Sequence, residues 1–329
     1  MSIQKRPLVN DLYTADPSAH VFNGKIYIYP SHDEDVDVEN NDNGDQYDMK
    51  DYHVYEMKDV ETYPRDCGCA FTLKDVKWAS KQLWAPDCVE KDGKYYFVFP
   101  ARDKEGFFRI GIAVGDKPEG PFKPEDDYIQ GSYSIDPCMF PDTDGKYYLT
   151  FGGIWGGQLD QYRNNKWSAD NKEPQGQEPA CTPKIALMKD NMKELAEEVR
   201  DLVILDENGK PLTGGDEDRR YFEDPWLFKK GDTYYFTYST GTTHFLCYAT
   251  SKNVYGPYTY GGKILTPVLG WTTHHSILEY QGKWYLFYHD CERSKGINQK
   301  RNVKFRELTF DDKGNIQTMD GLDWGNVKN

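Results

Sequence analysis

The sequence predicts an all-β fold, a five-bladed β-propeller with about four antiparallel strands per blade. Five times along its 329 residues, a short apolar stretch is followed by a turn that ends in glycine and by an aromatic strand. A third apolar run follows in four of the copies, and the chain has 25 tyrosines, a residue that suits strands. A pattern with constant local order indicates one structural unit that is used five times.

The five copies give the blades in chain order. They begin at Ala15 (ADPSAHVFNGKIYIYPSHD), Leu83, Ser134, Tyr221 and Thr272. Their turn glycines are Gly24, Gly93, Gly145, Gly231 and Gly282. In the second and third copies, an Asp-Gly pair between two β-rich runs is a strong hairpin signal. Each copy therefore predicts an inner strand, a tight turn and a second strand.

The segments between and after the copies are less regular. The run MKELAEEVRDL, which begins at Met192, has apolar residues at helical spacing, and it is either a short surface helix or an extended segment. The tail that begins at Asn302 predicts one more hairpin, which would complete the final blade. No linker rich in serine, proline or glycine divides the chain, so residues 1–329 are predicted to form a single propeller domain.

Two polar loops interrupt the strand pattern. Residues 33–51 are acidic and nearly without core-forming side chains, so we expect a solvated loop. Residues 163–179 are polar and contain proline and glycine, and this loop is expected to wall one side of the propeller mouth.

The composition restricts the class of partner. A formal net charge of −14 argues against nucleic acid or an anionic membrane, because both attract basic surfaces, and it fits a neutral ligand. The sequence shows neither a signal peptide nor a membrane span. Seven cysteines without paired spacing favour reduced thiols. We therefore expect a cytoplasmic protein, and the sequence leaves open whether it forms a homo-oligomer.

The repeat also predicts a site. The first strand of every propeller blade lines the central channel, so equivalent positions near the start of these strands converge at one end of the axis. Eight residues before the turn glycine (nine in the third copy) stand Asp16, Ala85, Asp136, Glu223 and His274. Three carboxylates and an imidazole in one pocket drive each other's pKa values apart, which is how a site obtains both a base and an acid.

A simpler interpretation exists for each acid alone. Asp16 and Asp136 each precede a proline, as does Asp224, and aspartate before proline is a common turn residue. The agreement across five repeats favours a functional site instead. The same count assigns Glu223 to the site and Asp224 to the turn.

Several of these motifs together resemble glycoside hydrolase family 43, whose members are five-bladed propellers that act on xylose- and arabinose-containing glycans. The motifs are ADPS, WAPD, SIDP, FEDPWLF and HHS, followed by an arginine-containing tail. The resemblance implies that Asp16 is the general base, that Glu223 is the general acid, and that Asp136 tunes the pKa of the acid. It also implies inversion of the anomeric configuration, which requires two carboxyl groups about 6.5–9.5 Å apart.

The resemblance extends to the surroundings of these acids. It places His274 beside a Ca²⁺ ion on the propeller axis that is held largely by water. It implies that Arg301 reaches the sugar, with Arg306 as the alternative. Trp84 and Trp155 are candidates for apolar walls of the sugar site, and ordinary core packing is the alternative for both.

The implied activity is release of xylose, and of arabinofuranose, from short xylo- and arabinoxylo-oligosaccharides. One alternative is an α-L-arabinofuranosidase of the same family that acts on arabinan or arabinoxylan. Another is a carbohydrate-binding propeller without catalysis, which would not need all three carboxylates. A fructan hydrolase is disfavoured because the chain has no WMNDPNG-type start.

Overall fold

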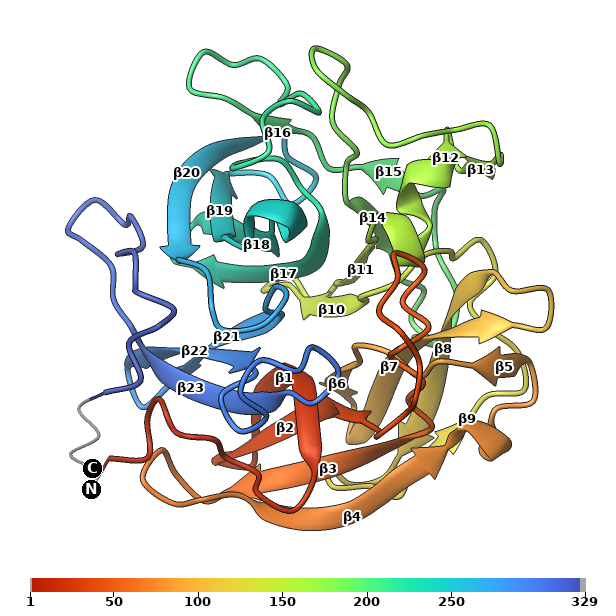
Figure 1. Cartoon of the computed structure of the whole chain (residues 1–329), viewed down its shortest axis with the longest axis vertical. Coiled ribbons are helices and arrows are strands. Elements are labelled where there is room, and N and C mark those ends of the chain that lie inside the picture. Colours follow the sequence, from red (N-terminus) through yellow and green to blue (C-terminus); the bar gives the residue numbers. More distant parts are fainter. Residues whose placement is uncertain (1, 326–329) are drawn as a thin grey trace.

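Five β-sheets are arranged around a central axis in the computed structural model, which describes residues 2–325 (Figure 1). The predicted all-β, five-bladed propeller is thus confirmed. The inner strands of the blades contact one another around the ring: β1 with β6 and β21, β10 with β6 and β17, and β17 with β21. The start of each inner strand therefore faces a common centre.

The blades differ in their number of strands. Blade one contains β1 (Tyr13–Phe22), β2 (Lys25–Asp33), β3 (Asp51–Met57) and β4 (Arg65–Thr72). Blade two contains β5 (Ala79–Lys81), β6 (Asp87–Lys91), β7 (Lys94–Asp103), β8 (Phe108–Gly115) and β9 (Lys123–Pro124). Blade three contains β10 (Cys138–Pro141), β11 (Tyr147–Phe151), β14 (Lys184–Leu187) and β15 (Arg200–Asp201), and β12 (Tyr162–Arg163) and β13 (Lys166–Trp167) form a separate hairpin.

Blades four and five complete the ring. Blade four contains β17 (Glu223–Lys230), β18 (Thr233–Ser239), β19 (Leu246–Ser251) and β20 (Tyr258–Leu265), with β16 (Ile204–Leu205) parallel to β20 at its edge. Blade five contains β21 (His275–Tyr280), β22 (Lys283–Asp290) and β23 (Asn302–Leu308). Short 3₁₀ turns are η1 (Leu73–Asp75), η2 (Trp155–Gly157), η3 (Leu159–Gln161) and η4 (Gly241–Thr243). Within residues 2–325, no helix has the length and apolar character needed to cross a membrane.

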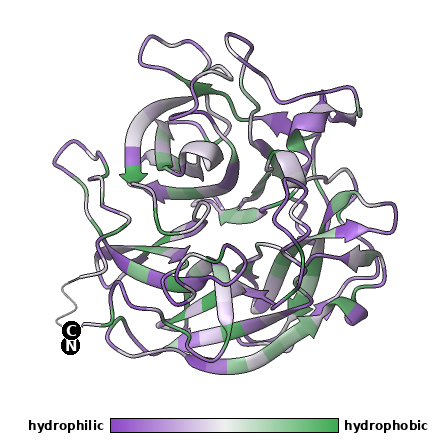
Figure 2. Cartoon of the chain, viewed as in Figure 1, coloured by the Kyte–Doolittle hydropathy of each residue, from purple (hydrophilic) through white to green (hydrophobic). Residues whose placement is uncertain are grey.

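Most strands are buried along nearly their whole length, on both faces, because each blade packs against its two neighbours. Hydrophobic residues concentrate on the strands and hydrophilic residues on the connecting loops (Figure 2). The buried clusters join adjacent blades; one of them, for example, contains Tyr29 and Tyr52 of blade one and Phe97 and Phe99 of blade two. Aromatic rings stacked in this way supply a large buried area per residue. The turn glycines all have positive φ, which is the backbone conformation that tight hairpins require.

The segment from Met192 to Leu202 is extended, so of the two interpretations the helical one is wrong. Leu195 forms a bridge to Met188, and the Ala196 N–H donates to the Leu187 carbonyl. Met192 is buried with a φ of 61°, which no α-helix allows. Packing of this run against blade three overrides its helical spacing.

The predicted completion of the last blade by the C-terminal tail is confirmed for its first strand, β23, which pairs with β22, but not for the second arm of the hairpin. A turn joins Phe310 to Ile316, but the chain then runs to blade four, where Met319 donates to the Ile264 carbonyl. The N-terminal segment pairs with β23 instead: the Leu8 N–H donates to Val303 at 2.9 Å, and the Lys5 N–H to Phe305 at 2.8 Å. The two ends of the chain thereby close the ring.

The contribution of the N-terminal segment to the free energy of unfolding can be measured. Leu8 is 3% exposed and packs in one apolar cluster with Val303 and Phe305. We expect Leu8→Ala to lower the free energy of unfolding by about 2–5 kcal/mol, because the substitution leaves a cavity in this cluster. Urea-induced unfolding measures the change. Leu322→Ala is the matched control, since Leu322 is 57% exposed and its loss should change the free energy by less than about 0.5 kcal/mol. Equal effects of the two variants would contradict a structural role for the N-terminal segment.

Candidate active site

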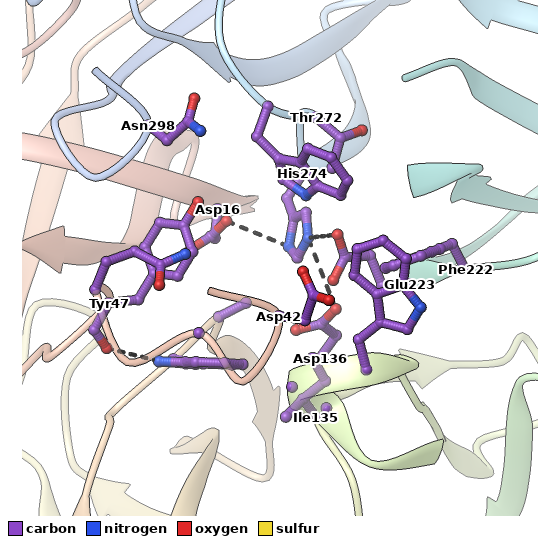
Figure 3. A pocket seen from close by; sticks show the side chains of 18 of the residues that line it. Asp16, Asp42, Tyr47, Ile135, Asp136, Phe222, Glu223, Thr272, His274 and Asn298 are labelled. Carbon is purple, nitrogen blue, oxygen red and sulfur yellow. Dashed lines mark hydrogen bonds and ion pairs between the residues drawn. The ribbon is translucent and has the colours of Figure 1, made fainter. Parts of the chain in front are cut away.

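The four register residues that carry chemistry meet in one cavity at the propeller axis (Figure 3). The cavity has a volume of about 270 Å³ and is lined by Asp16, Asp136, Glu223 and His274. Ala85, the fifth register position, also lines it. The sequence repeat therefore predicted spatial proximity between residues up to 258 positions apart, as Asp16 and His274 are.

A β-bulge presents the acids to the cavity. Asp16, Asp136 and Asp224 have φ values of 50°, 57° and 63°, and each precedes a proline. In β1 the regular pairing breaks between Ala15 and Ser18, and in β17 it breaks between Glu223 and Trp226. The extra residue bends the strand and redirects the side chains next to it.

The bulge corrects one prediction. Ala15 pairs with Ser31, and Glu223 pairs with Ser239, so Glu223 is the backbone equivalent of Ala15. Asp224, and not Glu223, therefore occupies the register position of Asp16. The count from the glycine reached Glu223 because Gly231 is the first of the two turn residues in the fourth copy, whereas Gly24 is the second in the first copy. Glu223 nevertheless reaches the cavity and lies 3.3 Å from His274 Nε2.

Asp16 is buried and surrounded by groups that favour its ionised form. Arg301 Nη1 donates to Oδ1 at 3.1 Å, and the Ser31 hydroxyl donates to Oδ2. Burial alone would raise the pKa of Asp16, but Arg301, His274 and His289 together with the Ser31 hydrogen bond lower it to about 2. The carboxylate is therefore charged at neutral and mildly acidic pH.

His289 holds Asp16 from the backbone side. Its Nδ1 accepts the Asp16 N–H at 3.0 Å, and its Nε2 donates to the Thr272 carbonyl at 2.9 Å. Burial and the charges of Arg301 and His274 keep the pKa of His289 well below its usual range, so this imidazole is neutral. The alignment of the five repeats did not predict His289. That alignment covered the start of the inner strand of each blade, whereas His289 lies near the end of β22, the second strand of blade five.

A second carboxylate, that of Asp33, fixes Arg301, and the sequence did not predict this residue either. Asp33 accepts hydrogen bonds from Arg301 Nε at 2.9 Å, from Nη2 at 2.7 Å and from the Arg301 N–H at 2.9 Å. The guanidinium also lies over the ring of Tyr47, 4.8 Å from its centre. Arg301 lines the cavity, whereas Arg306 bonds to Asp320 and Asp323 near the C-terminus. Of the two candidate arginines, Arg301 is thus the one at the site.

His274 lies between the carboxylates, as Figure 3 shows. Its Nδ1 lies 3.2 Å from Asp16, and its Nε2 lies 3.3 Å from Glu223 and 3.8 Å from Asp136. Burial lowers the pKa of His274, but the surrounding carboxylates outweigh it and hold the pKa well above the usual range. Nδ1 is buried and, among the described residues, has no partner in hydrogen-bond geometry.

The pKa of Asp136 is shifted in the opposite direction to that of Asp16. Burial, together with the nearby charges of Glu223, Asp224 and Asp16, raises the pKa of Asp136 well above its usual range, although His274 opposes this. Its Oδ2 accepts the Asp224 N–H at 3.0 Å. The cavity therefore combines a carboxylate that stays ionised with a carboxyl group that retains its proton.

Asp224 and His275 face away from this cavity. The Asp224 carboxylate accepts the His275 N–H at 2.9 Å and pairs with its Nδ1, and His275 Nε2 lies 2.6 Å from the Thr237 hydroxyl. The prediction that His275 serves in hydrogen bonding, on the opposite side from His274, is confirmed. Burial raises the pKa of Asp224, and His275 opposes that rise.

Aromatic side chains form two walls of the axial cavity. Trp84 lines the cavity, donates from Nε1 to the Tyr47 carbonyl at 2.8 Å and packs on Phe108. Trp155 lines the other side and donates from Nε1 to Glu173 at 2.8 Å. Phe222 and Trp271 pack against Trp155 and extend this wall. The sequence did not predict either residue. Phe222 lies one residue before Glu223, and Trp271 lies three residues before His274.

The prediction of a solvated acidic loop at residues 33–51 fits residues 37–43, which are exposed, and is wrong for residues 44–49, which are buried or half-buried. Asn40, Asn41, Asp42, Gly44, Gln46, Tyr47 and Met49 all line the cavity. In Figure 1 this segment, between β2 and β3, reaches across to blade three. Arg102 holds it by donating to the Asn43 carbonyl and side chain, and Gln82 donates to the Gly44 carbonyl. Polar contacts order the loop, so its lack of apolar residues was misleading. The second loop, residues 163–179, contributes Glu173 behind Trp155 but does not line the cavity.

Comparison with known proteins decides the family. The sequence pattern of glycosyl hydrolases family 43 matches residues 5–316. The chain belongs to this family. It is a glycoside hydrolase, and its fold is that of solved family 43 enzymes.

Its relatives are similar along nearly their whole length. Xylosidase/arabinosidase 43A of Humicola insolens is 57% identical, over 95% of this chain and 98% of its own. A xylosidase/arabinosidase of Bacteroides ovatus is 55% identical, over 98% of this chain and 100% of its own. Among solved structures, a β-xylosidase/α-arabinofuranosidase from a compost metagenome, calcium-free and in complex with xylotriose, has a TM-score of 0.95 and 54% identity, with 98% of each chain covered. A Xanthomonas citri family 43 enzyme in complex with xylose has a TM-score of 0.93 and 50% identity, covering 98% of this chain and 94% of its own.

The contact between Arg301 and Asp16 gives a pH prediction. Removal of the guanidinium leaves burial to raise the pKa of Asp16, so a larger fraction of this carboxyl group is protonated and inactive at acid pH. We expect the acid limb of the kcat/KM profile of Arg301→Gln to lie about 1–3 pH units above that of the wild type. Arg306→Gln is the matched control and should keep the wild-type limb. If Arg301→Gln loses activity without a shift of the limb, Arg301 does not control the charge of Asp16.

Proposed function

We propose that this family 43 enzyme is an inverting exo-acting β-xylosidase with α-L-arabinofuranosidase activity. The observation that carries the proposal is the position of His274 between Asp16 and Glu223, which contact opposite nitrogens of one imidazole ring. The two carboxyl groups are thus separated by a ring and two contacts. Such a separation suits inverting glycosidases, which need room for a water molecule beside the sugar.

In this mechanism Asp16 is the general base. Its low pKa keeps it ionised, and Ser31, Arg301 and His289 fix its orientation. Asp16 accepts a proton from a water molecule as that water attacks the anomeric carbon. On the other side of the sugar, Glu223 donates a proton to the glycosidic oxygen as the bond to the leaving group breaks. Since attack and departure occur on opposite faces, the configuration inverts.

Asp136 supports the acid in this proposal. It lies with Glu223 on the same side of His274, and a buried pair of carboxyl groups does not readily carry two negative charges. The raised pKa of Asp136 therefore keeps a proton in the part of the cavity where Glu223 acts. Asp136 acts through its charge and does not need to contact the leaving group.

The size and lining of the cavity suit a single pentose at the reaction centre. Its volume of about 270 Å³ is slightly below the range for pockets that hold drug-sized ligands, about 300–1,000 Å³. Trp84, Trp155 and Trp271 supply apolar faces of the kind on which sugar rings pack. Similar structures hold xylose and xylotriose, which supports short xylo-oligosaccharides as the substrate class. Short arabinoxylo-oligosaccharides fit the same proposal, because the names of the relatives include arabinosidase.

A Ca²⁺ ion at the axis is part of the proposal. The residues fit a cation, because Asp136, Glu223 and His274 each offer a ligand atom within 4.8 Å of the others, and the nitrogen of His274 nearest the two acids is Nε2. His274 would hold the ion together with water and the carboxylates around it, since Ca²⁺ prefers oxygen ligands. When bound, the ion supplies positive charge beneath the carboxylates. The cytoplasmic location and the oligomeric state stay predictions.

Hydrolysis of two aryl glycosides, followed by NMR, tests this function. We expect turnover of an aryl β-D-xyloside and slower turnover of an aryl α-L-arabinofuranoside, with α-xylose as the first product of the xyloside. The Asp16→Asn variant, prepared in the same way, is the control for contaminating activity and should lose turnover. β-Xylose as the first product would contradict inversion. Among natural substrates, xylobiose should be cleaved faster than arabinan fragments, and the reverse order would favour the arabinan-directed alternative. Sugar binding without any turnover would indicate a binding propeller.

A further inference from the structure

A second group of metal-ligating side chains lies in blade one, apart from the axial cavity. It consists of His32 near the end of β2, and of Asp51 and His53 in β3. One ligand atom from each residue lies within 4.8 Å of the others, and the two imidazole rings are 5.7 Å apart. The side chains are 17%, 26% and 19% exposed, so an ion from solution can reach them. None of the three lines the axial cavity.

The sheet holds these residues in place. Asp51 and His53 are two positions apart on one strand, so their side chains lie on the same face of blade one. β2 is the antiparallel neighbour of β3, and His32 Nδ1 is 2.6 Å from Asp51 Oδ1. His32 pairs with Thr14 of β1, and Asp51 and His53 pair with Thr72 and Cys69 of β4. All three donors therefore lie on paired strands, which reduces the entropy that binding must overcome.

His53 also has the outer partner that metal-binding histidines usually have. The Asp66 carboxylate lies 3.0 Å from His53 Nδ1 and is itself fixed by the Gly68 N–H. A carboxylate on one ring nitrogen orients the imidazole and leaves the other nitrogen as a ligand. Within the described part of the chain, the Nε2 atom of His53 makes no hydrogen bond, and His32 Nδ1 faces the Asp51 carboxylate.

We propose that His32, Asp51 and His53 form a site for a transition-metal ion such as Zn²⁺, distinct from the axial Ca²⁺ site. Two imidazoles and one carboxylate are a ligand set that Zn²⁺ accepts, with water in the fourth position. Ca²⁺, which prefers oxygen ligands, is disfavoured here. Binding requires small side-chain rotations that bring the donors within about 2.0–2.2 Å of the ion, and the ion replaces the proton that His32 shares with Asp51.

The position of the site suggests what the ion does. His32 and Asp51 stand at the two ends of the segment 33–50, whose middle lines the axial cavity. Asp33, next to His32, holds Arg301. An ion bound at the base of this segment cross-links its two ends and stabilises the folded state. It takes no part in the chemistry.

Zn²⁺ titration of the metal-free enzyme, with excess Ca²⁺ present to occupy the axial site, tests the proposal. We expect one Zn²⁺ per chain by equilibrium dialysis. At a Zn²⁺ concentration 100 times the dissociation constant, we expect a rise of about 3–4 °C in the unfolding midpoint. His32→Gln and His53→Gln should each weaken binding at least tenfold, and Asp66→Asn by about 10–100-fold. His244→Gln is the matched control, because His244 packs on Trp271 away from blade one, and it should bind Zn²⁺ as the wild type does.

The outcomes separate this site from the axial one. Activity on an aryl xyloside shows that His32→Gln and His53→Gln are folded. If both folded variants still bind one Zn²⁺ with unchanged affinity, the ion lies elsewhere and the proposal is wrong. If the wild type binds no Zn²⁺ when Ca²⁺ is in excess, the proposal is wrong as well. Loss of Zn²⁺ binding in both variants, but not in His244→Gln, supports it.

Discussion

The site depends on one buried ion network, in which Arg301 joins Asp33 to Asp16. The cavity gathers several carboxyl groups in a place that burial makes unfavourable for charge, and a lone buried charge costs several kcal/mol. Arg301 offsets this cost by donating hydrogen bonds to the carboxylates of Asp33 and Asp16. His274 lies beside the other two acids, Asp136 and Glu223. Asp16 is thus kept ionised and Asp136 is kept protonated in the same small volume. The separation of pKa values that acid–base catalysis requires follows from these contacts.

The ring closure brings this network together. Asp16, Ser31 and Asp33 belong to blade one, whereas His274, His289 and Arg301 belong to blade five and the segment around it. The Thr14 N–H donates to the Arg301 carbonyl at 3.1 Å, so the first strand is hydrogen-bonded to the last blade directly beside the base. The N-terminal segment on β23 reinforces the same junction. The stability of the propeller and the geometry of the catalytic site therefore depend on one interface between the two ends of the chain.

The five-fold repeat made the fold and most of the acidic site predictable from the sequence. A propeller turns equal positions in successive units into neighbours in space, so Asp16, Asp136, Glu223 and His274 could be grouped without a structure. The register failed by one residue at Glu223, because the count started from the turn glycine, and Gly231 stands one position earlier in its two-residue turn than Gly24 does. Asp33 and His289 were missed because they end second strands, which the comparison of inner strands did not cover. Tyr47 was missed because its loop is ordered by Arg102 and Gln82, and such polar contacts leave no periodic pattern in sequence.

The central claim is that Asp16 activates the nucleophile on the face opposite Glu223, and chemical rescue with azide tests it most directly. In Asp16→Ala, azide can enter the space of the missing carboxylate and attack an aryl β-D-xyloside from that face. The account predicts restored release of the aryl group and formation of α-xylosyl azide, identified by NMR. A β-xylosyl azide from this variant would place the vacated space on the side of the leaving group. That result would contradict the assignment of Asp16 as the base.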